Sequence, residues 1–139
     1  MSKEQIKLRG FTLVELIITL SIAAILAAIA APSFATSIQN NRMATQYNEL
    51  LASLTLARSE AIKRAQRVSM CQSSTGSSCS GSASNWHDGW VVFVDTDSDD
   101  IIDPGEEILR VNAALSGGNT LAFGTTRTRV AYASDGLAV

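Results

Sequence analysis

An apolar run with a single charge constrains this chain more than any other feature. From Phe11 to Ala31 the sequence FTLVELIITLSIAAILAAIAA carries only Glu15 as a charged residue. A helix of this length reaches about 31 Å, enough to cross the hydrocarbon core of a bilayer. Lys3, Lys7 and Arg9 precede the run, and an export signal also begins with a basic end before an apolar stretch. The sequence therefore predicts a segment that enters a membrane.

An ordinary cleaved signal peptide is the alternative interpretation of this segment. Its apolar region would be shorter than this one, but Ala28 to Ala30 read AIA, the small-residue pattern of a cleavage site. Cleavage there would start the mature chain near Ala31 and leave it without a membrane segment.

The helical pattern continues beyond the apolar run. After Pro32, which is expected to kink or loosen the helix locally, neither Gly nor Pro occurs before Gly76. Apolar residues recur there at spacings of three and four, the pattern of one buried stripe: Tyr47, Leu50, Leu51, Leu54, Ala57, Ala61, Ile62 and Ala65. The sequence predicts one nearly continuous helix from about Phe11 to about Gln66.

The rest of the chain has the pattern of a small sheet. Short β-branched or aromatic segments alternate with turn-rich stretches: RVSMC, GWVVFVD, EEILRVN, TLAFG and RTRVAYA. We expect four or five antiparallel strands packed on the second half of the helix. The expected fold class is α+β.

Two stretches carry a family resemblance. RGFTLVE, with Gly10, Phe11 and then Glu15, resembles the class III signal of type IV pilins and of the pseudopilins of type II secretion. The sequence from AAPSF through LARSEAIKRAQRVSMC, with GWVVFVD downstream, resembles the GspH/FimT group of minor pilins and pseudopilins, FimT most closely. The resemblance implies the pilin fold, divided into a leader (1–10), a membrane and filament-core helix (11–31), its amphipathic continuation (32–67) and an antiparallel β domain (68–139).

The resemblance also implies how the chain is processed. In the family a prepilin peptidase cuts between the residues matching Gly10 and Phe11 and methylates the new amino group of Phe11. Subunits then leave the bilayer and stack their helices in a filament core with other major and minor pilins.

Glu15 needs a partner in such a setting. A carboxylate in an apolar helix costs roughly 2.5–3.5 kcal/mol near the bilayer centre. The freed α-amino group of Phe11, in the same or a neighbouring subunit, would offset that cost and fix the register of the helices. The alternative is that Glu15 reaches the membrane interface without a role in assembly.

Cys71 and Cys79 lie in a Ser/Gly-rich segment, CQSSTGSSC, expected to be an exposed loop. If the chain is exported, an oxidising compartment permits a disulfide between them. Such a bond would stabilise the fold by about 2–3 kcal/mol. Two free thiols in a cytosolic loop are the alternative.

The acidic stretch DTDSDDIIDPGE has the spacing of a twelve-residue calcium loop. Asp95, Asp97 and Asp99 occupy positions one, three and five, the Ile101 carbonyl position seven, Asp103 position nine and Glu106 position twelve. Against calcium, Asp100 stands at position six where Gly is preferred, and the flanks read as strands. A solvated acidic hairpin loop is the alternative.

Charge gives only local support for nucleic-acid binding. The formal net charge is −2, and the chain without its basic leader is more acidic still, so bulk charge does not attract DNA. Arg127 and Arg129 in TTRTRVAY are expected on one face of a strand, where they would contact consecutive phosphates. FimT-like proteins are implicated in DNA capture through a Gly-Arg-x-Arg segment near the carboxyl terminus, but this chain ends in SDGLAV, with Leu137 where an arginine would stand.

These features predict assembly and contact rather than catalysis. His87 is the only histidine and has no nucleophile at a recognisable spacing, so no enzyme is expected. Trp86 and Trp90 are expected as core or loop anchors.

The expected protein is a FimT-like minor type IV pilin that requires no cofactor, with Ca2+ as the one candidate ligand. The alternative is a type II secretion pseudopilin. Its expected partners are the prepilin peptidase, other pilins, the inner membrane before assembly and double-stranded DNA. It would be a single-pass inner-membrane protein with its bulk in the periplasm, and later part of a pilus at the cell surface.

Overall fold

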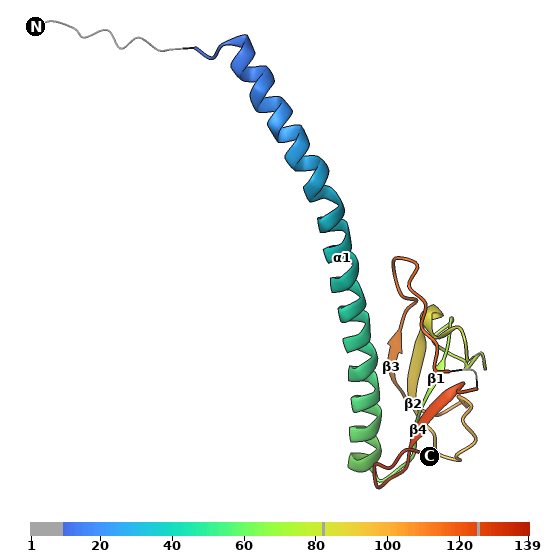
Figure 1. Ribbon diagram of the computed structural model, residues 1–139. Coiled ribbons are helices and arrows are strands. Elements are labelled where there is room, and N and C mark those ends of the chain that lie inside the picture. The colour runs from blue at the N-terminus through green and yellow to red at the C-terminus, as the bar shows by residue number, and fades with distance from the viewer. Residues whose placement is uncertain (1–9, 82, 125) are drawn as a thin grey trace, which may run out of the picture. The chain divides into compact units, whose positions relative to one another are not determined.

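The computed structural model describes residues 10–81, 83–124 and 126–139. The expected leader therefore lies outside the described residues, apart from Gly10. The elements in chain order are α1 (Leu13–Arg64), β1 (Val68–Gln72), the short 3-10 helix η1 (Trp86–Asp88), β2 (Trp90–Val94), β3 (Ile108–Asn112) and β4 (Arg129–Tyr132) (Figure 1). The chain forms two compact units, Met1–Arg42 and Met43–Val139. The predicted long helix and the α+β class are both confirmed.

The part of α1 in the first unit has no cover of its own. All the side chains described in residues 10–30 and 33–42 are exposed, although this is the most apolar part of the chain. Two of its hydroxyls are satisfied within the helix: Thr19 donates to the Leu16 carbonyl at 2.9 Å and Ser21 to the Ile17 carbonyl at 2.8 Å. The helix is continuous through residue 32.

In the second unit α1 buries a narrower stripe than the sequence predicts. Leu50, Ala57 and Ala61 are buried as expected, but Tyr47 and Ile62 are 60% and 52% exposed. Polar residues occupy the remaining positions of the stripe, namely Gln46 and Ser53. Both have partners, which is why they are tolerated there: Gln46 donates to the Ser116 carbonyl at 2.9 Å, and Ser53 donates to the Glu49 carbonyl at 2.9 Å.

The sheet has the strand order β3-β2-β1-β4, and its paired strands are antiparallel. The central pair aligns Met70 with Val92 and Cys71 with Val91. The strand expected at TLAFG is wrong, because residues 120–124 lie in a loop. Phe123 of this loop meets Trp86 edge to face, with ring centroids 4.7 Å apart. Its apolar residues therefore cover the core instead of joining the ladder.

The two faces of the sheet carry two separate apolar clusters, because successive side chains of a strand point to opposite sides. One face packs against α1, and this cluster holds the buried residues Leu50, Ala57, Ala61, Val68, Met70, Trp86, Trp90 and Val92. On the other face Cys71, Val91 and Phe93 pack with Cys79 and Ile102. The disulfide loop and the acidic loop thus each supply a residue that covers the second face.

Candidate functional site

The amino end of α1 is held by a side-chain cap. The Glu15 N–H donates to Thr12 Oγ1 at 3.2 Å, and the Leu16 N–H donates to the Thr12 carbonyl at 3.1 Å. Thr12 is therefore the N-cap, and Glu15 stands three residues later in the first turn, where a negative charge suits the helix dipole. Gly10, Phe11, Thr12 and Glu15 line one hollow. Thr12 and Glu15 have the Thr-x-x-Glu spacing of a capping box. This spacing predicts the cap from the sequence, but it was not among the sequence-based predictions.

The two cysteines form the expected bond. Cys71 and Cys79 are joined with their Cα atoms 5.6 Å apart. Cys71 belongs to β1 and is buried between Val91 and Phe93. The bond therefore ties the Ser/Gly-rich loop to the interior of the second unit.

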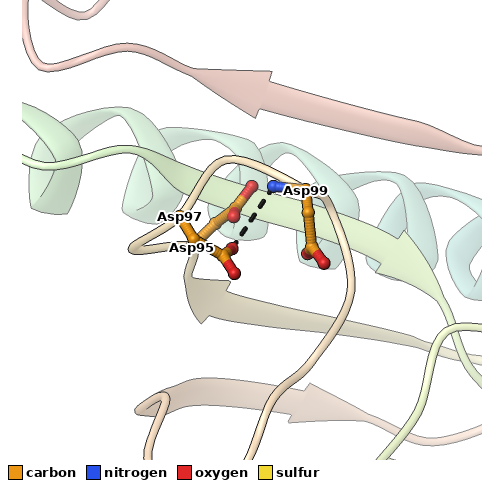
Figure 2. A group of neighbouring side chains, drawn as sticks. All are labelled: Asp95, Asp97 and Asp99. Carbon is orange, nitrogen blue, oxygen red and sulfur yellow. Dashed lines mark hydrogen bonds between the residues drawn. The ribbon is translucent and has the colours of Figure 1, made fainter.

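The acidic loop brings three of the six expected metal ligands together. One carboxylate oxygen from each of Asp95, Asp97 and Asp99 lies within 4.8 Å of the other two, as Figure 2 shows. Glu106 is used differently, because its Oε1 accepts the Thr96 N–H at 2.7 Å and its Oε2 the Asp103 N–H at 3.2 Å.

The basic residues near this loop are paired within the fold. Arg67 Nε lies 3.1 Å from Asp95 Oδ2, and Asp100 accepts a short contact from Arg67 and lies 3.1 Å from Arg129 Nη1. Burial opposes ionisation of Asp100, but Arg129 and Arg67 outweigh it and hold the pKa of this carboxyl below its usual value. Arg64, the last residue of α1, is also engaged, since it lies 2.6 Å from Glu60 and 2.6 Å from Glu107.

The two candidate DNA-binding arginines do not share a strand. Arg129 begins β4, whereas Arg127 precedes it. The expectation that both project from one strand face is therefore wrong. They still line one hollow together with Thr126, Thr128 and the last two residues of the chain. Those last residues fold back on β4, where the Val139 N–H donates to the Ala131 carbonyl at 3.0 Å.

The comparisons with known proteins bear on both units. The family model described as "Type II transport protein GspH" matches residues 46–139. The chain belongs to the GspH family. A second model, described as "Prokaryotic N-terminal methylation motif", matches residues 7–31. No curated protein and no solved structure matches the chain significantly.

Membership of the GspH family explains the layout of the sites. The methylation motif covers the capped turn with Gly10, Phe11 and Glu15, and it implies processing by a prepilin peptidase and assembly with other pilins. α1 contains a stretch long and apolar enough to cross a membrane, which is consistent with anchoring in the inner membrane. This GspH-family chain is thus a minor pilin or pseudopilin, and such proteins are structural rather than enzymatic.

Trp86 and Trp90 serve the fold through their side chains, and His87 does so through its backbone carbonyl. Trp86 and Trp90 are fully buried, as expected of core anchors. Trp86 Nε1 donates to the Arg127 carbonyl at 3.2 Å, and the Leu115 N–H donates to the His87 carbonyl at 2.7 Å. η1 therefore holds the connection between β3 and β4 at two points.

Proposed function

We propose that this GspH-family chain is a minor type IV pilin of the FimT kind that takes part in pilus assembly. Before assembly it is anchored in the inner membrane with residues 43–139 in the periplasm, and afterwards it belongs to a pilus. The observation that carries the proposal is the uncovered apolar helix behind a processing motif. In residues 10–41 Glu15 is the only charge, and the apolar side chains described in residues 10–30 and 33–41 lie exposed.

Such a surface is not stable in water. Burial of one large aliphatic side chain is worth about 1.5–3 kcal/mol, and this helix exposes a long series: Leu13, Val14, Leu16, Ile17, Ile18, Leu20, Ile22, Ile25, Leu26 and Ile29. Lipid covers such a helix in a membrane, and other helices of the same kind cover it in a filament. The exposed run therefore supports a subunit that exchanges one cover for the other.

Mass spectrometry of the mature amino terminus tests this proposal. Chain purified from the native membrane should begin at Phe11 with a methylated α-amino group. A terminus at Ala31 would instead show an ordinary signal peptide and would remove the filament helix from the mature protein.

A pseudopilin of type II secretion is the alternative system, and the description of the matching family model supports it. The two systems differ in what is lost when the gene is deleted. If the chain is a minor pilin, deletion of its gene should reduce surface pili and leave protein secretion intact. Loss of secreted proteins with normal pili would assign the chain to type II secretion.

DNA capture is a second candidate function, supported by the hollow beside β4. Two guanidinium groups, Arg127 and Arg129, and two hydroxyls, Thr126 and Thr128, line it, and these are groups that bind phosphate. Arg129 is already paired with Asp100 at 3.1 Å, so Arg127 should contribute more.

Duplex binding by the full chain in detergent micelles, measured at two salt concentrations, tests this second function. We expect affinity to fall steeply with salt, and the salt slope to drop by about one when Arg127→Ala removes a phosphate contact. Arg110→Ala, in β3, is the matched control. Equal binding by the Arg127→Ala and Arg110→Ala chains, or none at low salt, would leave only the assembly role.

A further inference from the structure

We propose that the acidic loop between β2 and β3 binds a calcium ion through Asp95, Asp97 and Asp99. Their carboxylate oxygens lie within 4.8 Å of one another. Three negative charges at such distances repel one another, and a cation between them removes that repulsion. Two oxygens bound to one Ca2+ at about 2.3–2.6 Å lie no more than about 5.2 Å apart, so the separations of these three oxygens are compatible with one coordination sphere.

The buried end of the site distinguishes it from an ordinary acidic surface loop. Asp95 is fully buried. Its Oδ2 accepts the Ser69 hydroxyl at 2.7 Å and lies 3.1 Å from Arg67 Nε, whereas its Oδ1 is buried with no hydrogen-bond partner in the described part of the chain. An unsatisfied buried carboxylate oxygen is costly. Asp97 and Asp99 are exposed at the rim. A cation bound between these three residues would therefore give the buried Asp95 carboxylate a further partner and remain accessible from solvent.

Among the described residues, Asp95, Asp97 and Asp99 are the acidic residues whose carboxylate oxygens cluster in this loop. Since calcium takes six to eight oxygens, backbone carbonyls and water would complete the shell.

The loop is held in place without the ion. Asp100 pairs with Arg67 and Arg129, and Ile102 packs against the second face of the sheet. Asp100 also adopts a φ of +63° at the sixth position of the loop, so the turn usually made by Gly is present. Glu106 positions the loop through Thr96 and Asp103. The protein ligands are thus Asp95, Asp97 and Asp99, and Glu106 is a positioning residue.

Calcium binding to the full chain in detergent micelles tests the proposal. Chelated protein would be dialysed against radioactive Ca2+, with Mg2+ as competitor, and its thermal unfolding followed with EDTA, with Ca2+ and with Mg2+. We expect one bound Ca2+ per chain, with Ca2+ raising the unfolding temperature by about 5 °C or more at saturation, and a much smaller shift with Mg2+. No bound Ca2+ at millimolar concentration would overturn the proposal.

Single substitutions at the rim locate the ion. Asp97→Asn and Asp99→Asn keep the size of exposed side chains, so the fold without calcium should be unchanged, while calcium affinity should fall about tenfold or more. Asp88→Asn, which removes an acid outside the loop, is the control. Equal calcium affinity in the Asp97→Asn, Asp99→Asn and Asp88→Asn chains would show that any bound ion lies elsewhere and would overturn the proposal. If one of the two rim variants unfolds in EDTA, the other rim variant is compared with the Asp88→Asn chain.

Discussion

At the scale of single residues, Ser53 shows how a polar side chain serves an apolar interface. It is fully buried within the stripe of α1. Its hydroxyl accepts the Trp90 indole N–H at 2.9 Å and lies 3.2 Å from Asn112 Oδ1. One hydroxyl therefore connects the helix to β2 and to the end of β3.

Ser53→Ala should destabilise the second unit. The Trp90 N–H would lose its acceptor inside the core, and an unsatisfied buried donor costs about 1–3 kcal/mol. Chemical denaturation of the full chain, followed by tryptophan fluorescence, measures the loss. Ser59→Ala is the matched control, because Ser59 is an exposed serine on the same helix whose hydroxyl donates to the Leu56 carbonyl of its own helix. Equal effects of the two changes would contradict this role of Ser53.

Ala65 ends α1 in an unfavourable conformation. It has a φ of +52°, and the Gln66 N–H reaches the Ala61 carbonyl at 3.2 Å while the Ala65 N–H reaches the Ile62 carbonyl at 3.3 Å. These two bonds form a Schellman motif, in which Gly is preferred at the left-handed position. Ala65→Gly should therefore stabilise the chain by about 0.5–1 kcal/mol, seen as a higher denaturation midpoint. Ala52→Gly, at an exposed position inside α1, should have the opposite sign.

At the scale of elements, Arg64 joins the end of α1 to the start of β3. It pairs with Glu60 in its own helix and with Glu107, which directly precedes β3. Hydrogen bonds from Arg64 are the main cause of the lowered pKa of both carboxyls. A carboxyl with a lowered folded pKa stabilises the fold above its unfolded pKa of about 4.3, and this stability is lost as the pH falls through the folded value.

The unfolding temperature of the full chain should therefore fall as the pH is lowered from about 5 to about 3. Arg64→Gln should make this fall shallower, because the two carboxyls would then titrate closer to their unfolded values. Arg42→Gln, an exposed change in the first unit, should leave the slope unchanged. An identical slope in the Arg64→Gln chain would show that other groups dominate acid unfolding.

Some elements could be predicted from the sequence because their signal is local. The bounds of α1 were accurate to about two residues, since the lack of Gly and Pro and the apolar spacing lie within the helix itself. The strand predicted at TLAFG was wrong because alternating apolar residues have the same pattern whether they pair in a strand or cover Trp86 from a loop. The pairing of Arg129 with Asp100 leaves no local pattern at all, since these residues meet only after the sheet has formed. The candidate calcium ligands had a local spacing, but the engagement of Glu106 with Thr96 did not.

At the scale of the whole molecule, the chain combines a unit with its own core and a helix that needs an external cover. The second unit holds the buried clusters and the disulfide, whereas the described side chains of the first unit are exposed. A chain of this kind is complete only in a membrane or an assembly. Glu15 is the one charge in residues 10–41, so this residue is where a role of charge in assembly can be tested.

Glu15 has two candidate roles, at the helix end and in assembly, that a pair of substitutions can separate. In the structure it follows the Thr12 cap at the capping-box position, where Gln is also favoured. In a filament its charge would pair with the freed amino group of Phe11. Glu15→Gln keeps the capping capacity and removes the charge, whereas Thr12→Ala removes the cap and keeps the charge.

If the ion pair guides assembly, the Glu15→Gln chain should be lost from isolated pili as completely as the Glu15→Leu chain, while the Thr12→Ala chain should be incorporated. Immunoblots of sheared pili, with mass spectrometry to verify processing at Phe11 in each variant, measure this. Normal incorporation of the Glu15→Gln chain would show that the carboxylate serves only the helix end, because the charge would then be dispensable at the step where helices enter the fibre.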